Sequence, residues 1–160
     1  MTNLRIAKKE DKELYKNLFN ILHNDISPYN NELQEVDKQG YFDSKTVDVY
    51  FQNNESVMPF IITADNKTAG AVVLTTKPYV KDGCDYCIQE LIVLSLYRGK
   101  KIAAEACDII FKKYRGRYCV IVLKENLRAI KFWDKLIAKN SYLGSEDLDD
   151  KSFVYEFQIK

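Results

Sequence analysis

The sequence predicts a mixed α/β fold in which helices interrupt a β-sheet. Apolar and β-branched runs of strand length dominate the middle of the chain. Segments with apolar residues at helical spacing separate these runs. One strand-helix-strand unit lies between Cys87 and Leu123, where a right-handed crossover would make the two strands parallel.

The first third of the chain begins with a short strand and an amphipathic helix. Leu4 to Ala7 forms the strand, and Lys9 to Asn24 forms the helix. The helix places charged residues between apolar ones at helical spacing, namely Leu14, Leu18, Ile21 and Leu22. A polar, aromatic-rich segment from Asp25 to Asn54 follows, with a second helix expected near Asp43 to Gln52.

A hairpin and a further strand occupy the middle of the chain. The β-rich runs Pro59 to Ala64 and Ala69 to Thr76 are joined by Asp65-Asn66-Lys67. Because Asp and Asn tolerate turn conformations, these two strands should be antiparallel. Another turn, Lys81-Asp82-Gly83, leads to an apolar strand from Cys87 to Leu94.

Helices alternate with strands in the C-terminal half. The first helix is expected to run from about Gly99 to a stop at Arg115-Gly116, with an inward face formed by Ile102, Ala103, Ala106, Ile109, Ile110 and Tyr114. A buried strand from Tyr118 to Leu123 and a helix from Asn126 to Ala138 follow. Short strands around Tyr142 to Gly144 and Phe153 to Ile159 complete the chain.

Length and composition favour one soluble globular domain spanning residues 1–160. At roughly 150 residues per domain the chain fills one domain, and a hydrophobic content of 46% supplies a core. The formal net charge of +1 gives no global field that would recruit nucleic acid or an anionic membrane. The N-terminus has no signal-like apolar run, and no stretch approaches the roughly 20 apolar residues of a membrane span, so we expect a cytoplasmic protein.

The four cysteines are too few for a disulfide scaffold in a chain of this length. Cys84 and Cys87 have the spacing of a metal or redox pair. A zinc site would need a second pair at similar spacing, but Cys107 and Cys119 are twelve residues apart and the only histidine is His23. A redox pair would need a helix directly after it, which the sequence does not predict. We therefore expect reduced thiols, several of them buried, and no metal.

The junction between the central strand and the next helix has the properties of a phosphate site. The first turn of a helix leaves backbone N–H groups without partners at the positive end of the helix dipole. Arg98, Lys100 and Lys101 add positive charge at this point. Gly99 and Ala103 are small enough for a ligand to approach the backbone closely. Together these features suit a pyrophosphate.

Two motifs resemble signatures of the GNAT superfamily of N-acetyltransferases. The run from Arg98 to Ala103 is similar to the acetyl-CoA signature Arg/Gln-x-x-Gly-x-Gly/Ala, with Lys101 in place of the middle glycine. The run from Asn126 to Trp133 resembles the segment Asn-x-x-Ala-x-x-Phe-Tyr, with Trp133 in place of the tyrosine. Both motifs occur in the order that the family shows.

The resemblance implies a fold and a co-substrate. The family has a mixed, mostly antiparallel central sheet flanked by helices, and its members use acetyl-CoA. The pyrophosphate would contact the junction residues Arg98, Gly99, Lys100, Lys101, Ile102 and Ala103. The pantetheine arm would contact the strand backbone at Leu91 and Val93 and the side chain of Asn126.

The resemblance also implies a reaction, the direct transfer of acetyl to a primary amine in a ternary complex. The amine must be neutral to attack, and Glu90 is our candidate base because burial in an apolar strand would raise its pKa. Alternatively, Glu90 pairs with a Lys or Arg at the sheet surface. An indole has no proton to transfer near neutral pH, so Trp133 does not supply the usual acid. Tyr142 is our candidate acid, with Tyr97 and solvent as alternatives.

The acceptor, an amine of a small molecule or peptide, is not identified by the sequence. Aromatic residues lie where the family builds its acceptor pocket, although packing in the core explains each of them equally well; they are Tyr29, Tyr41, Phe42, Tyr50 and Phe51.

His23, in a polar context, is expected on the surface. Strand alternation places Glu90 on the face opposite Leu91 and Val93 unless a bulge intervenes. The oligomeric state stays open, a homodimer included.

The alternative function is a non-catalytic module that binds acetyl-CoA or CoA, motivated by Lys101 and Trp133. A third hypothesis, nucleic-acid binding through the basic segment Arg98 to Arg117, lacks interleaved stacking aromatics and an excess of positive charge. We therefore expect an amine acceptor and neither a nucleic-acid nor a membrane partner.

Overall fold

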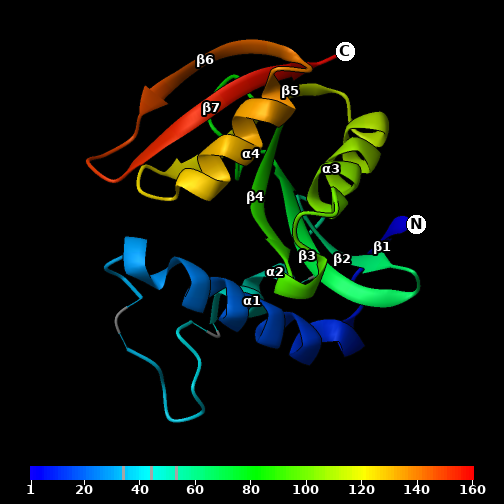
Figure 1. Ribbon diagram of the computed structural model, residues 1–160, viewed down its shortest axis with the longest axis vertical. Helices are drawn as coiled ribbons and strands as arrows, with labels where there is room; N and C mark the ends of the chain where they lie inside the picture. The colour runs from blue at the N-terminus through cyan, green and yellow to red at the C-terminus, as the bar shows by residue number, and fades with distance from the viewer. Residues whose placement is uncertain (34, 44, 53) are drawn as a thin grey trace.

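A single β-sheet runs through the molecule (Figure 1). The computed structural model describes residues 1–33, 35–43, 45–52 and 54–160. Within these residues, seven strands lie in the order β1-β2-β3-β4-β5-β7-β6. Neighbouring strands are antiparallel except for β4 and β5, which confirms the predicted mixed, mostly antiparallel sheet. The bounds are Thr2–Ile6 (β1), Val57–Ala64 (β2), Lys67–Thr76 (β3), Tyr86–Val93 (β4), Gly116–Leu123 (β5), Ser141–Asp147 (β6) and Ser152–Ile159 (β7).

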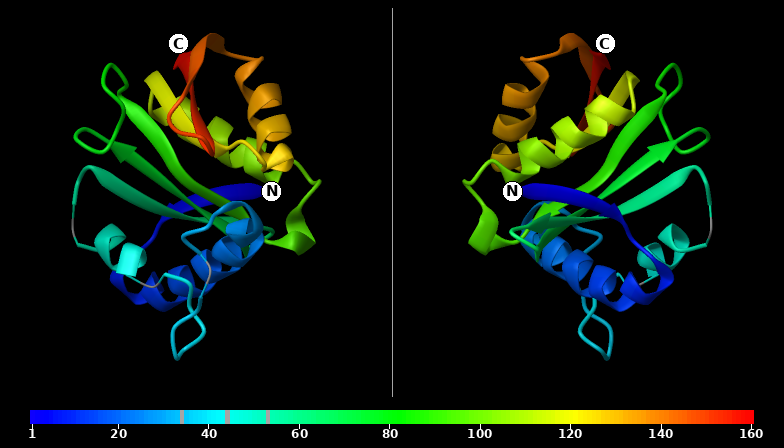
Figure 2. Two further views of the ribbon diagram at one scale, coloured as in Figure 1. Left: turned by 90° about the vertical axis from the view of Figure 1, so that its left-hand side faces the viewer. Right: turned by 90° about the vertical axis from the view of Figure 1, so that its right-hand side faces the viewer.

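Helices cover both faces of the sheet (Figure 2). Helices α1 (Lys12–Ile26) and α2 (Lys45–Tyr50) lie on one face, and α3 (Ile102–Lys113) and α4 (Leu127–Ile137) lie on the other. This arrangement gives the flanked sheet that the sequence predicts. In the described part of the chain, none of the helices combines the length and the apolar character needed to cross a bilayer.

The first core lies between the sheet and helices α3 and α4. The rings of Tyr118 and Phe157 stack at 5.5 Å, and Phe111 packs edge-on against Tyr118 at 4.9 Å. Trp133 of α4 is 6% exposed in the same core. Each such buried aromatic side chain stabilises the fold by roughly 1.5–3 kcal/mol relative to its exposed state. The apolar faces predicted for the two C-terminal helices therefore hold them against the sheet.

The second core lies between the sheet and helices α1 and α2. Tyr15 of α1 is fully buried there, and its single hydroxyl proton is shared between the carbonyl oxygens of Phe60 on β2 (2.7 Å) and Val72 on β3 (3.0 Å). A buried hydroxyl needs such partners, because an unpaired one would cost about 1–3 kcal/mol. These bonds fix the position of α1 on the N-terminal half of the sheet.

The predicted hairpin is formed by β2 and β3. Asp65 and Asn66 both have positive φ, at +49° and +63°, between the paired residues Ala64 and Lys67. A two-residue loop with positive φ at both positions matches the right-handed twist of the strands, and Asp and Asn tolerate this conformation better than most residues. The turn chemistry predicted from the sequence is confirmed.

Most predicted elements are present with shifted ends. The predicted helix from Lys9 begins with a short 3-10 turn, Lys9–Asp11, before α1. The prediction that the third helix begins at about Gly99 is wrong, because α3 begins at Ile102. Gly99 and Lys101 have φ of +75° and +65°, values that an α-helix excludes. The junction is therefore a loop that ends at the helix N-terminus.

The parallel strands β4 and β5 separate along their length. In the described part of the chain they pair at two positions, Tyr86 with Tyr118 and Cys87 with Cys119. Beyond these pairs β4 continues to Val93 against β3, and β5 continues to Leu123 against β7. The sheet thus has a closed end and an open end between β4 and β5, and the open end exposes strand backbone that has no partner strand.

Candidate active site

A bulge in β4 sets the position of Glu90. Val73 of β3 pairs with Glu90, whereas the next residue, Leu74, pairs with Ile88. Gln89 is therefore an extra residue in β4. One inserted residue changes which face of the sheet the following side chains occupy.

The side chains after the bulge divide between the two cores. Ile88 packs in the first core, whereas Glu90 contacts Tyr50 of the second core. Leu91 and Val93 pack against the first core. Glu90 therefore lies on the face of α1 and α2, opposite Leu91 and Val93, as strand alternation predicted.

Glu90 is half-buried, and its carboxyl group accepts a hydrogen bond from the Tyr50 hydroxyl at 3.4 Å. Burial, with a smaller contribution from the nearby charge of Asp43, raises the pKa of Glu90 to about 7 against the opposing effect of the Tyr50 bond. Among the described residues, no Lys or Arg forms an ion pair with Glu90. The alternative of a surface ion pair therefore has no support in the described contacts. A carboxyl group of this kind exchanges protons near neutral pH.

Backbone hydrogen-bonding groups of β4 point toward the open end. A Cβ atom placed on Gly70 of β3 would lie 2.0 Å from the carbonyl oxygen of Ile92, so that carbonyl points toward β3. Strand alternation then directs the N–H and C=O groups of Leu91 and Val93 away from β3. They face the side on which β5 has separated. This is the placement required for the predicted contacts with a pantetheine arm.

The loop before α3 presents the N–H groups of a helix N-terminus. Lys101 precedes the first residue of α3 and has a left-handed backbone conformation, with no side-chain cap on the helix. Gly99, Lys100 and Lys101 are on the accessible side of the loop, whereas Ile102 is buried and Ala103 is half-buried. The Nζ atom of Lys100 lies 5.8 Å from the centroid of the Tyr97 ring. The loop therefore brings together the predicted phosphate-binding amides and two lysines.

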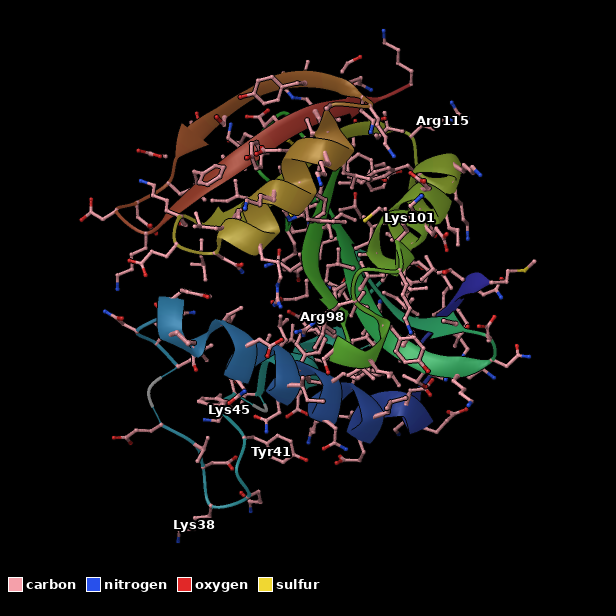
Figure 3. All side chains as sticks on the ribbon, viewed as in Figure 1. Lys38, Tyr41, Lys45, Arg98, Lys101 and Arg115 are labelled. Atoms are coloured by element: carbon pink, nitrogen blue, oxygen red, sulfur yellow. The ribbon has the colours of Figure 1, made fainter. Side chains whose placement is uncertain are left out.

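The side chain of Arg98 points toward α1 (Figure 3). Its Nε atom donates to the carbonyl oxygen of Val93 at 2.8 Å, and its guanidinium forms an ion pair with Asp25 near the end of α1. Asp25 also lies 3.7 Å from the guanidinium of Arg128 at the start of α4. Arg98 thus ties the loop to the strand end and to α1, and Asp25 neutralises part of its charge.

Asn126 occupies the position just before α4. Its side-chain oxygen accepts a hydrogen bond from the backbone N–H of Ala129 at 3.1 Å. This is a helix N-cap, which satisfies a backbone donor that the helix itself leaves unpaired. Asn126 therefore has a structural role in addition to its predicted contact with the cofactor.

The candidate acid, Tyr142, is not brought together with Glu90. Tyr142 lies on the edge strand β6, opposite Phe157 of β7, and its hydroxyl donates to Ser145 at 3.1 Å. Since paired residues share a face and Phe157 belongs to the first core, Tyr142 lies on the face opposite Glu90, with β5 and β7 between them. Tyr97, the other tyrosine considered, is half-buried in the loop before α3.

The prediction that His23 lies on the surface is wrong. His23 is 7% exposed, because α1 turns it inward against the ring of Phe19 at 6.2 Å. Burial lowers the pKa of His23, while the charge of Asp43 opposes this effect. The effect of Asp43 on Glu90 was not predictable from the sequence, because these residues come close only through the packing of the segment around α2 on the sheet.

The aromatic residues expected at an acceptor pocket have different surroundings. Tyr50 contacts Glu90, as described above, and Phe51 packs edge-on against Tyr15 at 5.3 Å in the second core. Tyr41 lies in the extended segment between α1 and α2 and donates to Asn17 at 3.1 Å (Figure 3). Of these residues, Tyr50 is the one whose contact links it to the candidate base.

Comparison with known families decides the family of the chain. Residues 20–137 match the model of the acetyltransferase (GNAT) family. The chain belongs to this family. The matched span contains Glu90 and the motifs that begin at Arg98 and Asn126. No curated protein matches the chain.

Solved structures share the GNAT fold over nearly the whole chain. An acetyltransferase from Thermus thermophilus has a TM-score of 0.70 and 12% identity, with coverage of 98% of this chain and 96% of that one. A GNAT-family acetyltransferase from Streptococcus agalactiae has a TM-score of 0.73 and 15% identity, covering 99% and 95%. The ribosomal-protein-S18-alanine N-acetyltransferase from Escherichia coli has a TM-score of 0.66 and 10% identity, covering 100% and 95%. At these identities the likeness establishes the fold.

The residues at the open end suit an acyl-CoA. The backbone of β4 beyond its pairs with β5 can hydrogen-bond an extended amide-containing arm, and the N-terminus of α3 can bind phosphate oxygens. Lys100 and Lys101 supply the positive charge. Among the described residues, no group of His, Cys, Asp or Glu side chains is arranged to hold a metal ion.

Proposed function

We propose that this GNAT-family protein transfers acetyl from acetyl-CoA to a primary amine of a small molecule or peptide, within a ternary complex. The observation that carries the proposal is the position of Glu90, half-buried beside the open end of the sheet with a pKa raised to about 7. An alkylammonium has a reference pKa near 10 and cannot attack a thioester until a base removes its proton. A carboxylate that titrates near neutral pH suits this task.

The proposed cofactor contacts follow the open end from the loop to the strands. The N–H groups at Gly99, Lys100, Lys101, Ile102 and Ala103, with the two lysine charges, bind the pyrophosphate. Arg98 holds this loop in place through its contacts with Val93 and Asp25. Backbone groups of Leu91 and Val93 and the carboxamide of Asn126 bind the pantetheine arm.

The proposed chemistry uses the side chain of Glu90 and the backbone of β4 at the open end. Glu90 accepts the proton of the bound ammonium, directly or through a water molecule, and the neutral amine attacks the acetyl carbonyl carbon. The backbone N–H of Val93 donates to the oxyanion that develops. The thiolate then leaves and takes a proton from solvent that enters the open end. Tyr142 is retained as the alternative acid to be tested, since Trp133 has no hydroxyl and is buried in the first core.

Acetyl-CoA consumption with a panel of amines tests the proposal. Release of free thiol that depends on an added amine, together with thermal stabilisation by CoA, is the expected result. Stabilisation by CoA without thiol release with any amine would favour the non-catalytic module, which the tryptophan at position 133 motivates. Absence of both effects would refute the cofactor assignment itself.

The remaining expectations from the sequence are part of the same proposal. We propose that residues 1–160 act as one catalytic domain in the cytoplasm, with an amine acceptor and without a metal, nucleic-acid or membrane partner. Fractionation of cells and sedimentation of the purified protein with and without nucleic acid or vesicles test these points.

A further inference from the structure

Thiol groups gather at the closed end of the β4–β5 pair. Cys84 from the loop before β4, Cys87 of β4 and Cys119 of β5 form a buried cluster with Val154 of β7. In the sequence, only Cys84 and Cys87 have the spacing of a pair. In the fold, Cys119 of β5 lies beside them. We call this set of three cysteines the thiol cluster. It lies on the face of the sheet opposite the first core, because Tyr118 and Val120, the neighbours of Cys119, belong to that core.

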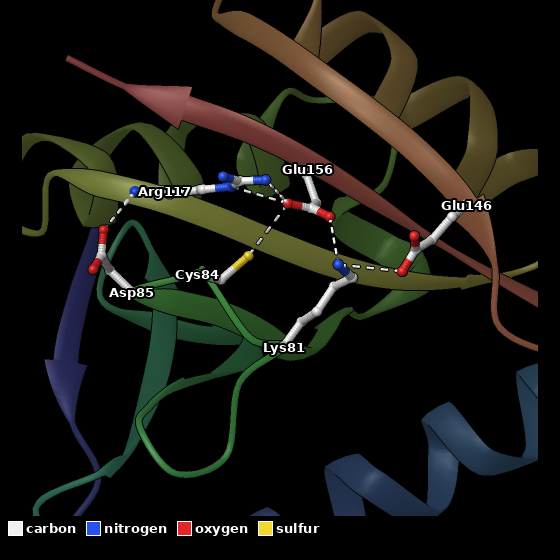
Figure 4. Close-up of polar contacts among 6 residues, drawn as sticks. All are labelled: Lys81, Cys84, Asp85, Arg117, Glu146 and Glu156. Carbon is white, nitrogen blue, oxygen red and sulfur yellow. Dashed lines mark hydrogen bonds and ion pairs between the residues drawn. The ribbon is translucent and has the colours of Figure 1, made fainter.

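Ion pairs hold the loop that closes the thiol cluster (Figure 4). Glu156 of β7 accepts a hydrogen bond from Arg117 at 2.9 Å and forms an ion pair with Lys81 at 2.8 Å. The sulfur of Cys84 lies 3.8 Å from the same carboxylate, and Asp85 accepts a bond from the backbone N–H of Arg117 at 2.8 Å. The loop from Lys81 to Asp85 is thus fastened to β5 and β7, and the thiol of Cys84 is directed to Glu156.

Cys87 and Cys119 are placed for a covalent bond with each other. They are direct partners in the parallel register of β4 and β5. Neighbouring strands are about 4.8 Å apart, and disulfides join Cα atoms separated by roughly 4.4–6.8 Å. Both cysteines also line a surface cavity of about 320 Å³, whereas Cys84 does not. The pair therefore has a route to small solutes.

The surroundings of Cys119 favour its thiolate form. Hydrogen bonds from the thiol of Cys87, from the backbone N–H of Lys81 and from the thiol of Cys84 lower the pKa of Cys119, against the opposing effect of burial. The same bond to Cys119, together with burial, raises the pKa of Cys87, which keeps its proton. Burial also raises the pKa of Cys107, which lies outside the cluster in the first core. One thiolate beside one thiol is the arrangement that oxidation to a disulfide requires.

We propose that Cys87 and Cys119 are a redox modification site at which a hydroperoxide forms a disulfide between β4 and β5. The Cys119 thiolate attacks the peroxide, the O–O bond breaks, and the departing oxygen takes up a proton from solvent, which balances the one that Cys119 released on ionising. A sulfenic acid and a molecule of water or alcohol result. The Cys87 sulfur then attacks the sulfenic sulfur. Its proton and the departing hydroxide form water. In sum, two thiols are oxidised, and one peroxide is reduced to two molecules of water, or to one of water and one of alcohol.

This proposal does not depend on acetyl transfer. The disulfide would lie at the two-residue pairing from which β4 and β5 diverge, next to the Gln89 bulge. It would add a covalent bond between two side chains to the backbone pairing of the strands. The site is therefore a means by which oxidants could act on the shape of the open end.

Peptide mapping after peroxide treatment tests the proposal on the unmodified full chain. The folded protein is exposed to hydrogen peroxide, free thiols are alkylated under denaturing conditions, and peptides are mapped by mass spectrometry. We expect a Cys87–Cys119 crosslink, loss of alkylation at these two residues, and full alkylation of Cys84 and Cys107. Reduction by dithiothreitol should restore both thiols.

Matched variants and the opposing outcomes complete the test. Cys119→Ser and Cys87→Ser should abolish the crosslink, whereas Cys107→Ser should leave it unchanged. Four alkylated cysteines after treatment, a crosslink to Cys84 or Cys107, or a bond between two chains would each overturn the proposal. The mapping of the unmodified chain decides the matter even if a cysteine variant fails to fold.

Discussion

The two ends of the β4–β5 pair differ in how their polar groups are satisfied. At the closed end, Glu156 is 8% exposed and has two cationic partners, Lys81 and Arg117. At the open end, Glu90 has one hydroxyl partner at 3.4 Å and no ion pair among the described contacts. The pKa of Glu156 is lowered, chiefly by its bond with Lys81, whereas burial raises that of Glu90.

The contrast separates a structural carboxylate from a reactive one. A carboxylate with two cations stays ionised and contributes to stability at neutral pH. A carboxyl group whose pKa is raised by burial can act as a base near neutral pH. Its ionised form lowers the stability of the fold, because the charge is buried. The closed end of the strand pair therefore holds a carboxylate that stabilises the fold, Glu156, and the open end holds the candidate base, Glu90.

The largest expected effect is on turnover, from Glu90→Gln at the open end. Loss of a general base lowers rate by about 10²–10⁴-fold, and we expect this loss in kcat near pH 7.5. The loss should shrink as the pH approaches the pKa of the amine, because the acceptor then loses its proton without help. Thiol release measured across the pH range, with a CoA-binding assay beside it, checks this. Unchanged kcat with altered binding alone would remove Glu90 from the chemistry.

The stability of the same variant distinguishes the two ends further. The pKa of Glu90 rises from 4.5 to about 7 on folding. The contribution of this side chain to the free energy of unfolding is therefore complete below pH 4.5 and is lost as the pH rises through about 7. Glu90→Gln should therefore melt at a higher temperature than the unmodified protein at pH 8 and at a similar one at pH 4.5. A lower melting temperature at pH 8 would indicate a structural role.

At the closed end, Glu156→Gln should reduce stability and leave kcat unchanged. Removing the charge leaves Lys81 and Arg117 without their shared partner, and we expect a loss of about 1–3 kcal/mol in the free energy of unfolding. The pKa of Glu156 is lowered, so the loss should be complete at neutral pH, should begin to shrink below pH 4.5, and should vanish as the pH falls through the lowered pKa. Urea unfolding at both pH values measures it.

A matched control for Glu156 exists on the neighbouring strand. Glu146 also contacts Lys81, at 3.2 Å, but its side chain is 57% exposed. Glu146→Gln should change stability by well under about 1 kcal/mol, as for other exposed pairs. Equal losses in the two variants would mean that burial does not distinguish the two carboxylates.

Substitutions at Asn126 separate its cap from its proposed cofactor contact. Asn126→Ala should lose about 1 kcal/mol of stability, because the N–H of Ala129 loses its acceptor. Asn126→Ser keeps a capping oxygen and should lose much less. Both variants lack the carboxamide, so both should bind CoA more weakly if that group contacts the pantetheine arm. Calorimetric titration with CoA and thermal unfolding resolve the two effects, and unchanged CoA affinity in both variants would restrict Asn126 to the cap.

The smallest expected effect concerns the backbone of Lys101. A left-handed conformation costs a residue with a side chain roughly 1–2 kcal/mol, and glycine avoids this cost but loses about 0.5–1 kcal/mol of chain entropy on folding. Lys101→Gly should therefore raise stability by up to about 1 kcal/mol, as measured by urea unfolding. Lys101→Ala keeps the strain and removes the charge, so it should weaken CoA binding at unchanged stability. A lower stability for the glycine variant would contradict the strained loop.

Local patterns in the sequence were sufficient to predict the order of the elements. The spacing of apolar residues predicted α1, α3 and α4, and the Asp65-Asn66 turn predicted the hairpin of β2 and β3. The two motifs placed the candidate cofactor residues at the start of α3 and α4. Each of these features depends on residues that are neighbours along the chain, which is why they can be read without a structure.

Features that depend on distant residues were not predictable in the same way. The bulge at Gln89 exists only in the register between β3 and β4. Asp25 meets Arg98, and Cys119 meets Cys87, through the packing of segments far apart in the sequence. The late start of α3 was missed because Lys101 adopts a conformation that lysine seldom takes.

The outer edge of the sheet at β6 bears on how copies of the protein can associate. Its register shifts between Tyr142 and Gly144, and it carries the exposed carboxylates of Glu146 and Asp147. Irregular pairing and like charges both discourage the addition of a further strand. A homodimer that extended the sheet across β6 would bring such carboxylates close to one another, so this edge disfavours association by strand addition.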